Sequence, residues 1–344
     1  MDKFSDFISE QKNEQPYRFV NLIHHTPDDP NKTGDLMVAE AKKLGINDTY
    51  QLNVDGGYLT LNGKGSLVAH NFSVEEGKVV SATTTKNSDK KIIHDKEGFE
   101  ISPENTICFV RVAIGRGYHL LEQLRLHGVK TVNSRYCHMI CDDKWFNYVA
   151  LERSGFRQPK SDLISHIENL DTPIKNIGGK YPMILKSASG TQGVGVIFID
   201  SKQALLSTMQ LINKIDENVR MVIQEYIKTP YDVRAMVLNG EVVGQLKRPI
   251  ITGDFRSNIS QGNEPEKIEL TELEKSECIK VAKEVDGMWV GVDFIPSKDR
   301  EKESPYFIEV NSSPGTTHIS ELNNVNIHKK VIETFKNREN WRKL

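Results

Sequence analysis

Two carboxylates and one amide oxygen fall on two short apolar segments near the C-terminal end of the chain. Residues 289–295 (WVGVDFI) and 306–311 (YFIEVN) are rich in β-branched and aromatic residues, and the polar stretch between them is typical of a hairpin loop. Side chains alternate along a strand, so Glu309 and Asn311 face the same way, and Asp293 could join them from the neighbouring strand. Such hard oxygen donors suit Mg²⁺, which is commonly shared with substrate phosphates. Three ordinary polar residues on a surface strand pair are the simpler alternative.

A glycine-rich loop supplies a second candidate site. The segment 182–186 (PMILK) is predicted as a strand that ends in Lys186, and 196–199 is predicted as the strand that follows the loop. Glycines between two strands let backbone N–H groups approach phosphate oxygens, and a lysine there can reach a phosphate as a point charge. The spacing matches neither a Rossmann nor a Walker A pattern, and a flexible turn beside a solvated lysine is the simpler alternative. The loop glycines are Gly190, Gly193 and Gly195.

A nucleotide base could be bound at the next predicted strand, 222–227 (VIQEYI). A strand that ends beside a cleft can offer backbone groups to an adenine edge. Asp232 follows a few residues later, where a carboxylate can hold ribose hydroxyl groups. An ordinary core strand is the simpler alternative for this segment.

Basic side chains gather after this strand. Guanidinium groups bind carboxylates and phosphates bidentately, so the set is a candidate for neutralising or holding acidic groups. Scattered surface arginines are the alternative. The set comprises Arg234, Lys247, Arg248 and Arg256, with Asn258 close to the last of them.

The composition argues against several classes of protein. The chain has 344 residues, of which 38% are hydrophobic and 27% charged, as is typical of a globular protein with two or three subdomains. Its 45 Lys and Arg against 47 Asp and Glu give a formal charge of −2, which argues against a constitutive nucleic-acid binder. No run approaches the roughly 20 apolar residues of a membrane span, and the N-terminus lacks a signal-peptide apolar region. We therefore expect a soluble protein with no membrane or nucleic-acid partner.

The cysteines do not form the pattern of a disulfide framework in a chain of this length. Cys137, His138 and Cys141 invite a metal interpretation, but the sequence has no second ligand pair, so structural thiols are favoured. Cys108 and Cys278 complete the set of four. A reducing cytoplasm is the expected compartment.

The N-terminal part alternates predicted strands and helices, which favours a small α/β domain that ends near residue 140. A turn-rich stretch at 50–106 is predicted as a β-rich elaboration of this domain. The first sixteen or so residues are expected to form a loose polar arm. The expected strands are 19–23 and 108–112, and the expected helices are 36–44, opened by 33–35 and closed by Gly45, and 118–127.

The C-terminal part contains several strong local signals. Asn239-Gly240 between two apolar runs predicts a hairpin with a type I′ turn. Thr271 and Glu274 form a capping-box pattern that opens a helix, with Gly287 expected to end it. Helices are also expected at 144–154 and 202–215, and the hairpin strands at 233–238 and 241–246.

The order of these motifs resembles the ATP-grasp superfamily, and within it the RimK-type carboxylate–amine ligases. The resemblance covers about residues 108–335 and includes the glycine hairpin after Lys186, the strand 222–227, the run 253–258 (GDFRSN) and the two carboxylate-bearing strands. Lys144 matches the lysine at the start of the family's central domain. Arg111, Asn133 and Ser134 match weaker family positions.

The resemblance implies an α/β (α+β) fold with a small N-terminal α/β domain, a central lid domain and a C-terminal domain, at 1–140, 141–220 and 221–344. It implies ATP and Mg²⁺ as cofactors, with Mn²⁺ as an alternative. The implied site residues are Lys144, Lys186, Gly190, Gly193, Gly195, Gln224, Glu225, Tyr226, Ile227, Asp232 and Arg234 for the nucleotide, Arg248, Arg256 and Asn258 for catalysis, and Asp293, Glu309 and Asn311 for the metal.

The activity implied by the resemblance is ATP-dependent amide formation through an acyl phosphate. An amino acid such as glutamate would be joined to a protein, peptide or small-molecule acceptor, and a homo-oligomer is left open. The chain departs from the family at Lys247-Arg248-Pro249, where an arginine pair is common, and at 261–263 (QGN), where Arg-Gly-Gly is frequent. Two alternatives remain: a ligase of dipeptides or other small molecules, and a nucleotide-binding protein without catalysis.

Overall fold

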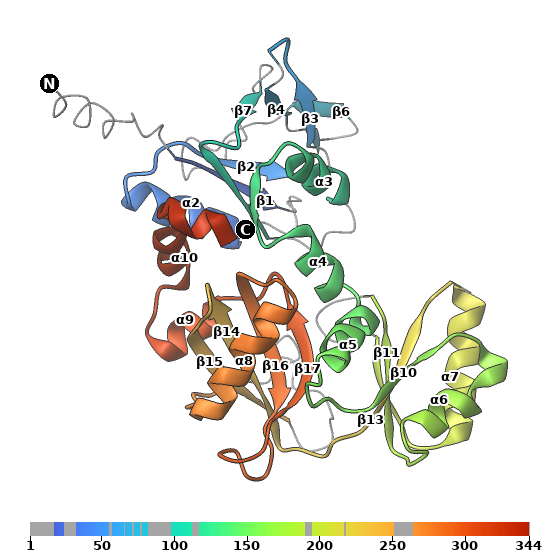
Figure 1. Cartoon of the computed structure of the whole chain (residues 1–344). Helices are drawn as coiled ribbons and strands as arrows, with labels where there is room; N and C mark the ends of the chain where they lie inside the picture. Colours follow the sequence, from blue (N-terminus) through green and yellow to red (C-terminus); the bar gives the residue numbers. More distant parts are fainter. Residues whose placement is uncertain are drawn as a thin grey trace, which may run out of the picture. The chain divides into compact units, whose positions relative to one another are not determined.

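A computed structural model describes most of the chain. The described residues are 17–23, 32–54, 57–64, 66–70, 72–75, 78–81, 98–111, 117–189, 195–216, 218–250 and 264–343. The chain divides into two compact units, one formed by Met1–Val132 with His328–Leu344 and the other by Asn133–Ile327. Figure 1 labels most of the helices and strands of both units.

The first unit is built on a parallel sheet with the strand order β2-β1-β8-β9. One face carries Val20 and Cys108, which pack against Leu120 and Leu124 of α3. On the other face Phe109 makes an edge contact with Phe335 of α10, with ring centroids 5.8 Å apart. The strands are β1 (Arg18–Ile23), β2 (Thr49–Asn53), β8 (Thr106–Val110) and β9 (Lys130–Val132), and the helices are α2 (Lys32–Lys43), α3 (Tyr118–Leu126) and α10 (Ile327–Lys336). The α/β character expected of the N-terminal part is present in this unit, whereas the division at 1–140, 141–220 and 221–344 stays a prediction.

The stretch at 50–106 is rich in strands, as expected. Three of them form an antiparallel sheet in the order β3-β4-β7, and two more form a separate pair. Tyr50 and Phe99 stack with ring centroids 4.1 Å apart and join this sheet to the parallel one. The strands are β3 (Tyr58–Leu61), β4 (Leu67–His70), β5 (Phe72–Glu75), β6 (Lys78–Ser81) and β7 (Phe99–Ile101).

The second unit contains two antiparallel sheets. The first has the order β10-β13-β11-β12, and we call it the lid sheet after the lid domain that the resemblance implies. One face carries Leu185 and Ile223, which pack against Leu205 and Met209 of α7. Because side chains alternate, Lys186 and Gln224 lie on the opposite face. In Figure 1 this sheet runs beside α6 and α7. Its strands are β10 (Ser161–Ile164), β11 (Met183–Ser187), β12 (Val196–Ile199) and β13 (Met221–Glu225), with the 3-10 turn η2 (Ile167–Asn169) and helices α6 (Asp171–Asn176) and α7 (Lys202–Ile215).

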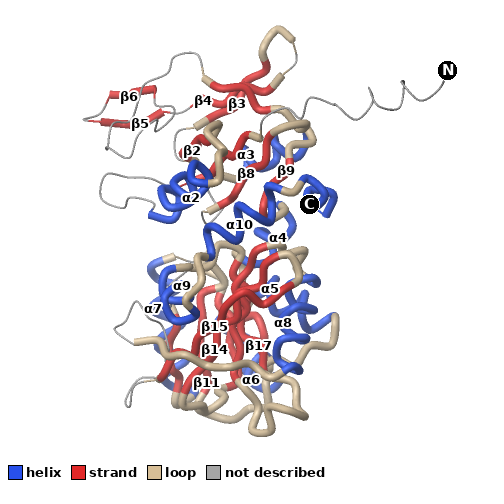
Figure 2. The backbone as a smooth tube through the Cα atoms, turned by 90° about the vertical axis from the view of Figure 1, so that its left-hand side faces the viewer, coloured by secondary structure: helices blue, strands red, loops and turns tan. Residues whose placement is uncertain are grey.

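The other sheet, which we call the carboxylate sheet, has the order β15-β14-β16-β17. One face buries Val233, Val292 and Phe294 against Cys278 and Val281 of α8. Figure 2 labels β14, β15 and β17 of this sheet, and β16 lies between β14 and β17. The strands are β14 (Tyr231–Leu238), β15 (Glu241–Pro249), β16 (Trp289–Ile295) and β17 (Tyr306–Asn311), and the nearby helices are α4 (Arg135–Cys141), α5 (Lys144–Arg153), α8 (Glu272–Glu284) and α9 (Thr317–Asn323), with the 3-10 turn η4 (Arg338–Lys343) at the chain end, in the first unit.

Local predictions were correct where the turn chemistry is strong. Asn239 and Gly240 have φ values of 49° and 82°, as a type I′ turn requires. The capping box of Thr271 and Glu274 is present. The end of that helix was predicted wrongly, because α8 stops at Glu284 and the left-handed residue is Asp286, with a φ of 55°.

The start of α2 differs from the prediction, whereas the interpretation of the cysteines is supported. The helix expected to begin at Leu36 begins at Lys32, so 33–35 belong to its first turn. All four cysteines are buried free thiols, and burial raises the pKa of the Cys141 thiol, which supports their interpretation as structural groups. Within the part of the chain that is described, no helix combines the length and apolar character needed to cross a membrane.

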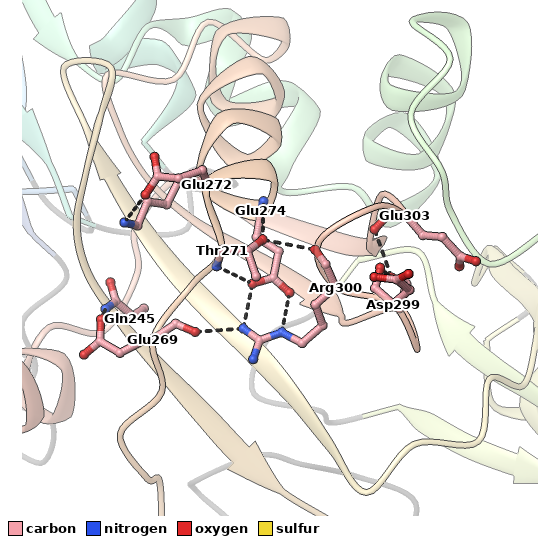
Figure 3. A network of polar contacts seen from close by, with 10 residues as sticks. Gln245, Glu269, Thr271, Glu272, Glu274, Asp299, Arg300 and Glu303 are labelled. Carbon is pink, nitrogen blue, oxygen red and sulfur yellow. Dashed lines mark hydrogen bonds and ion pairs between the residues drawn. The ribbon is translucent and has the colours of Figure 1, made fainter.

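A polar network ties the loop between β16 and β17 to the start of α8 (Figure 3). Arg300 lies in that loop and donates from Nε and Nη2 to the two carboxylate oxygens of Glu274, at 2.8 and 2.7 Å. Glu274 is 1% exposed and also accepts from the backbone N–H of Thr271. Thr271 in turn donates its hydroxyl to the Arg300 carbonyl at 3.1 Å. The loop that joins the two carboxylate-bearing strands is therefore fixed to a helix.

Replacing Arg300 with alanine should lower the free energy of unfolding, because the buried Glu274 carboxylate loses its charged partner. Hydrogen bonds to charged groups contribute about 1.5–3 kcal/mol, and urea unfolding would measure the loss. Arg153→Ala is the control, since that arginine pairs with Glu284 of the same helix but is 72% exposed, and exposed pairs contribute little. Equal losses for the two variants would contradict a special role for Arg300.

Candidate active site

Strand register brings the predicted metal ligands to one face of the carboxylate sheet. Asp293 pairs with Glu309, and Gly291 pairs with Asn311, across β16 and β17. On the other side of β16, Asp293 pairs with Arg234 of β14. The next strand adds Arg248, which lies opposite Asp232. Acidic and basic side chains from four strands thus share one face.

A β-bulge in β17 allows this arrangement. Asp293 pairs with Glu309 but the next residue, Phe294, pairs with Phe307, so Ile308 is an extra residue in β17. Without it, regular alternation would place Phe307 and Glu309 on the same face. With the bulge, Phe307 joins the hydrophobic core under α8 while Glu309 faces the opposite side.

Asp293 is the most heavily engaged carboxylate of the site. Arg234 donates to its two oxygens from Nε and Nη2, both at 2.6 Å, and Arg248 Nη2 donates to Oδ2 at 3.0 Å. Arg248 also binds both oxygens of Asp232, at 2.7 and 2.8 Å. Asp232, Arg248 and Asp293 are at most 6% exposed. Three strands are joined by this buried set of charges.

Arg234 and Arg248 favour the ionised form of Asp293. Burial of Asp293 opposes ionisation, but Arg234 and Arg248 outweigh it and hold the pKa of this carboxyl below its usual value. Burial likewise tends to lower the pKa of Arg248, yet Asp232 and Asp293 raise it above its usual value. Asp293 and Arg248 therefore carry charge at neutral pH.

Asn311 completes the face. With its amide oriented to satisfy both ends, Nδ2 donates to Glu309 Oε1 at 2.9 Å and Oδ1 accepts from Arg234 Nη2 at 3.2 Å. The opposite orientation would place Nδ2 3.4 Å from Asp293 Oδ2 but turn the amide oxygen toward acceptors. We adopt the first orientation, in which Asn311 links Glu309 to Arg234.

Lys186 projects from the lid sheet. Its Nζ donates to Gln224 Oε1 at 2.7 Å, and Gln224 donates to Ser161 Oγ at 2.8 Å. Burial lowers the pKa of Lys186 to about 8, although the charge of Glu309 raises it. Lys144 lowers it further, whereas Asp232 and Asp293 raise it. The lysine of the lid sheet is thus within electrostatic reach of the carboxylate sheet.

The base of the glycine loop is held from two sides. The Ala188 carbonyl accepts from the Lys144 N–H at 2.8 Å, and the Ala188 N–H donates to the Arg220 carbonyl at 2.9 Å. Asp143 caps α5 through Oδ1 and binds Arg220 Nη2 through Oδ2 at 2.8 Å. These contacts place Lys144 at the start of α5 beside the strand that carries Lys186.

Gly195 closes the far side of the loop. Its φ is 80°, a conformation that favours glycine, and its carbonyl accepts from the Ser187 N–H at 3.0 Å. Gly190, Gly193, Arg256 and Asn258 lie outside the described residues.

The residues predicted to bind adenosine lie at the end of β13 and just after it. Glu225 ends β13, and its Oε1 accepts from the Lys160 N–H at 2.8 Å. Tyr226 and Ile227 come just after the strand and are half-buried. Tyr226 meets Phe198 of β12 edge-on, with ring centroids 5.3 Å apart. Gln224 is more deeply buried, at 8% exposed.

Lys247, the neighbour of Arg248, points away from this site. It forms an ion pair with Glu266 at 2.8 Å and lies over the Tyr231 ring at 5.4 Å. Alternation along β15 explains the difference, since only Arg248 shares the face of Asp232.

Two buried asparagines hold the carboxylate strands in place: Asn133 matches a weaker family position, whereas Asn147 was not predicted from the sequence. Asn133 accepts from the N–H groups of Met288 and Trp289 and donates to the carbonyls of Trp289 and Ser312, all at 2.7–2.8 Å. Asn147 binds the backbone of Val310. The only sequence signal for Asn147 was a poor helix former inside a predicted helix.

The residues fit a magnesium ion by the chemistry of their donors. Two carboxylates and an amide oxygen lie on one face, and Mg²⁺ prefers such ligands. Asp293 and the Asn311 amide oxygen accept from Arg234 in this structure, so these two donors would exchange contacts with Arg234 for the metal. Within the described residues no group of three or more His, Cys, Asp or Glu side chains is placed to hold a metal, and the candidate set here has two carboxylates and one amide.

Comparison with known proteins defines the family. A family model described as the RimK-like ATP-grasp domain matches residues 141–335, which is more than half of the chain. The chain belongs to this family, and it is an ATP-dependent ligase that forms amide bonds.

Several relatives carry a more specific name. The "Probable alpha-L-glutamate ligase 2" of Pseudoalteromonas atlantica is 31% identical over 63% of this chain and 70% of its own length. The "Probable alpha-L-glutamate ligase" of Methanococcoides burtonii is 31% identical over 74% of this chain and 83% of its own length.

Solved structures show the same fold. The ATP-grasp ligase PsnB complexed with its minimal precursor has a TM-score of 0.62 at 16% identity, covering 93% of this chain and 98% of its own. The D-alanine–D-alanine ligase of Bacillus anthracis complexed with ATP has a TM-score of 0.61 at 16% identity, covering 95% and 100%. The predicted ATP-grasp fold is confirmed.

The lowered pKa of Lys186 predicts a pH dependence. The protonated amine is the form that attracts phosphate, so kcat/KM for ATP should fall as the pH rises through about 8. Lys186→Arg stays charged throughout this range and should remove that inflection. Initial rates from pH 6.5 to 9.5 would measure it, and an unchanged inflection in the variant would assign the titration to another group.

Proposed function

We propose that this ligase joins an amino acid such as glutamate to the carboxyl group of a protein or peptide acceptor. The observation that carries the proposal is the face of Asp293, Glu309 and Asn311, bordered by Arg234 and Arg248, in a chain of the RimK-like family. The relatives named as probable glutamate ligases support the choice of amino acid. The buried free cysteines support a reducing compartment such as the cytoplasm.

Metal binding is assigned to the bulged strand pair. Asp293, Glu309 and Asn311 would hold Mg²⁺, with Mn²⁺ as an alternative hard cation. When bound, the metal would neutralise charge on the phosphates during transfer.

Nucleotide binding is assigned to the face of the lid sheet that carries Lys186. Lys144 and Lys186 would contact phosphates, and the backbone of the glycine loop would cover them. The adenosine would lie against the end of β13. Asp232, whose two oxygens accept from Arg248 in this structure, would exchange one of these contacts for the ribose. The full proposed set is Lys144, Lys186, Gly190, Gly193, Gly195, Gln224, Glu225, Tyr226, Ile227, Asp232 and Arg234.

The chemistry proceeds by activation of a carboxylate. The acceptor carboxylate attacks the γ-phosphorus of ATP, ADP leaves, and an acyl phosphate forms. The amine then attacks the carbonyl carbon, and phosphate leaves with the bonding electrons as the amide forms. Arg248 would stabilise the negative charge that is transferred, and the support for this role is that two carboxylates fix its guanidinium group. Arg256 and Asn258 are proposed to hold the substrate end of the site.

The metal assignment predicts the effect of Glu309→Gln. This change keeps the shape of the side chain but removes its charge, so magnesium-dependent turnover should fall by orders of magnitude while the fold is retained. Rates measured across a magnesium titration would test this, with circular dichroism as the check on folding. Turnover close to that of the unmodified enzyme would remove Glu309 from the metal site.

The reaction predicts its own products. A screen of amino acids against peptide carboxyl acceptors should show release of ADP and phosphate only when both substrates are present, with glutamate among the accepted amino acids. Mass spectrometry of the acceptor should then show the added residue. Release of AMP and pyrophosphate would overturn the acyl phosphate route, and activity with free amino acids alone would favour a dipeptide ligase.

A further inference from the structure

The carboxylate sheet has two edge strands, β15 and β17. An edge strand presents backbone N–H and C=O groups that no neighbouring strand can pair. On β17 one residue has both groups bound by a single side chain. Asn147 Oδ1 accepts from the Val310 N–H at 3.3 Å, and Asn147 Nδ2 donates to the Val310 carbonyl at 3.3 Å.

The position of Val310 gives this contact its meaning. Val310 stands between Glu309 and Asn311, two of the three proposed metal ligands. Its own side chain is fully buried, and Asn147 is 1% exposed, so water does not compete for these hydrogen bonds. An amide that binds both the N–H and the C=O of one residue fixes the position of the strand backbone and its rotation about the strand axis at that residue. The side chains on either side take their directions from it.

The same helix reaches the nucleotide side of the site. Lys144 and Asn147 are three residues apart on α5, so they lie on neighbouring parts of its surface. The Lys144 N–H holds Ala188 at the base of the glycine loop. One short helix therefore contacts both the loop base and the strand with the two ligands.

We propose that Asn147 is a positioning residue that sets the geometry of Glu309 and Asn311. The inference rests on the metal site proposed above. Loss of the amide would leave the N–H and C=O of Val310 buried without partners, and the edge of β17 would relax. Groups that orient metal ligands typically change metal affinity by about 10- to 100-fold when they are removed.

The chain offers a matched control at the other edge of the same sheet. Asn323 of α9 accepts from the Gln245 N–H at 3.3 Å and donates to the Gln245 carbonyl at 2.8 Å. The two contacts with the strand are the same as those of Asn147 with Val310, although Asn323 is half-buried and also donates to the Ile319 carbonyl at 2.9 Å. The neighbours of Gln245 are Gly244 and Leu246, and neither is a proposed ligand. Asn323→Ala removes an edge contact of the same kind without touching the site.

The experiment compares Asn147→Ala with Asn323→Ala. Calorimetric titration of Mg²⁺ into enzyme with ADP, and the magnesium dependence of ATP turnover, should both show an affinity about 10- to 100-fold weaker for Asn147→Ala. Asn323→Ala should bind magnesium like the unmodified enzyme while losing some thermal stability. Equal magnesium responses in the two variants would overturn the proposal.

A milder variant covers the case in which Asn147→Ala does not fold. Asn147→Asp has the same shape and keeps the oxygen that accepts from the Val310 N–H but replaces the amide donor, so its magnesium affinity should lie between those of the unmodified enzyme and the alanine variant. An aspartate variant that binds magnesium like Asn323→Ala would overturn the proposal. Glu309→Gln separates the two hypotheses. If it leaves magnesium dependence unchanged, the metal site itself is wrong. If it abolishes that dependence while Asn147 variants match Asn323→Ala, only the positioning role is wrong.

Discussion

Compensation of buried charge is the constraint on which the site depends. Asp232, Arg248 and Asp293 are nearly inaccessible to water, and Arg234 adds a second positive group to Asp293. A buried carboxylate without a partner would be costly, and two guanidinium groups in bidentate contact offset that cost. The same low-dielectric surroundings strengthen the attraction of these groups for a phosphate or a cation. The arrangement that keeps the sheet folded also prepares its face for charged ligands.

The bulge at Ile308 lets one strand serve two purposes. Phe307 belongs to the hydrophobic core, whereas Glu309 belongs to the charged face, although the two residues have the spacing of side chains that share a face. One inserted residue resolves the conflict by turning the strand between them. The loop network of Glu274 and Arg300 and the edge contact of Asn147 hold that irregular strand on either side of the bulge.

Much of this could be predicted from the sequence. β16 and β17 have the expected bounds because runs of β-branched and aromatic residues between turn signals leave little choice of structure. The bulge could not be predicted, since YFIEVN also fits a regular strand. The contact of Asn147 with Val310 joins residues 163 positions apart, and no local pattern encodes it. At the end of α8 the left-handed residue is Asp286, and Gly287 follows it with its N–H on the Ala282 carbonyl, at a place where a Cβ would lie 2.5 Å from Val290 Cγ1.

Lys186 couples the lid sheet to the carboxylate sheet electrostatically. It is bound to Gln224 of its own sheet, yet Glu309, Asp232 and Asp293 of the other sheet raise its pKa against the effect of burial. A triphosphate carries several negative charges and a metal ion carries two positive ones. The triphosphate can therefore interact with the lysine while the metal ion interacts with the carboxylates, so the two ligands together complement the charges of the site better than either ligand alone. The charge distribution across the two sheets therefore favours binding of the metal and the nucleotide together. Helix α5 contacts both sheets, through Lys144 at the base of the glycine loop and Asn147 at β17, and so holds the two sets of charged side chains at a fixed separation.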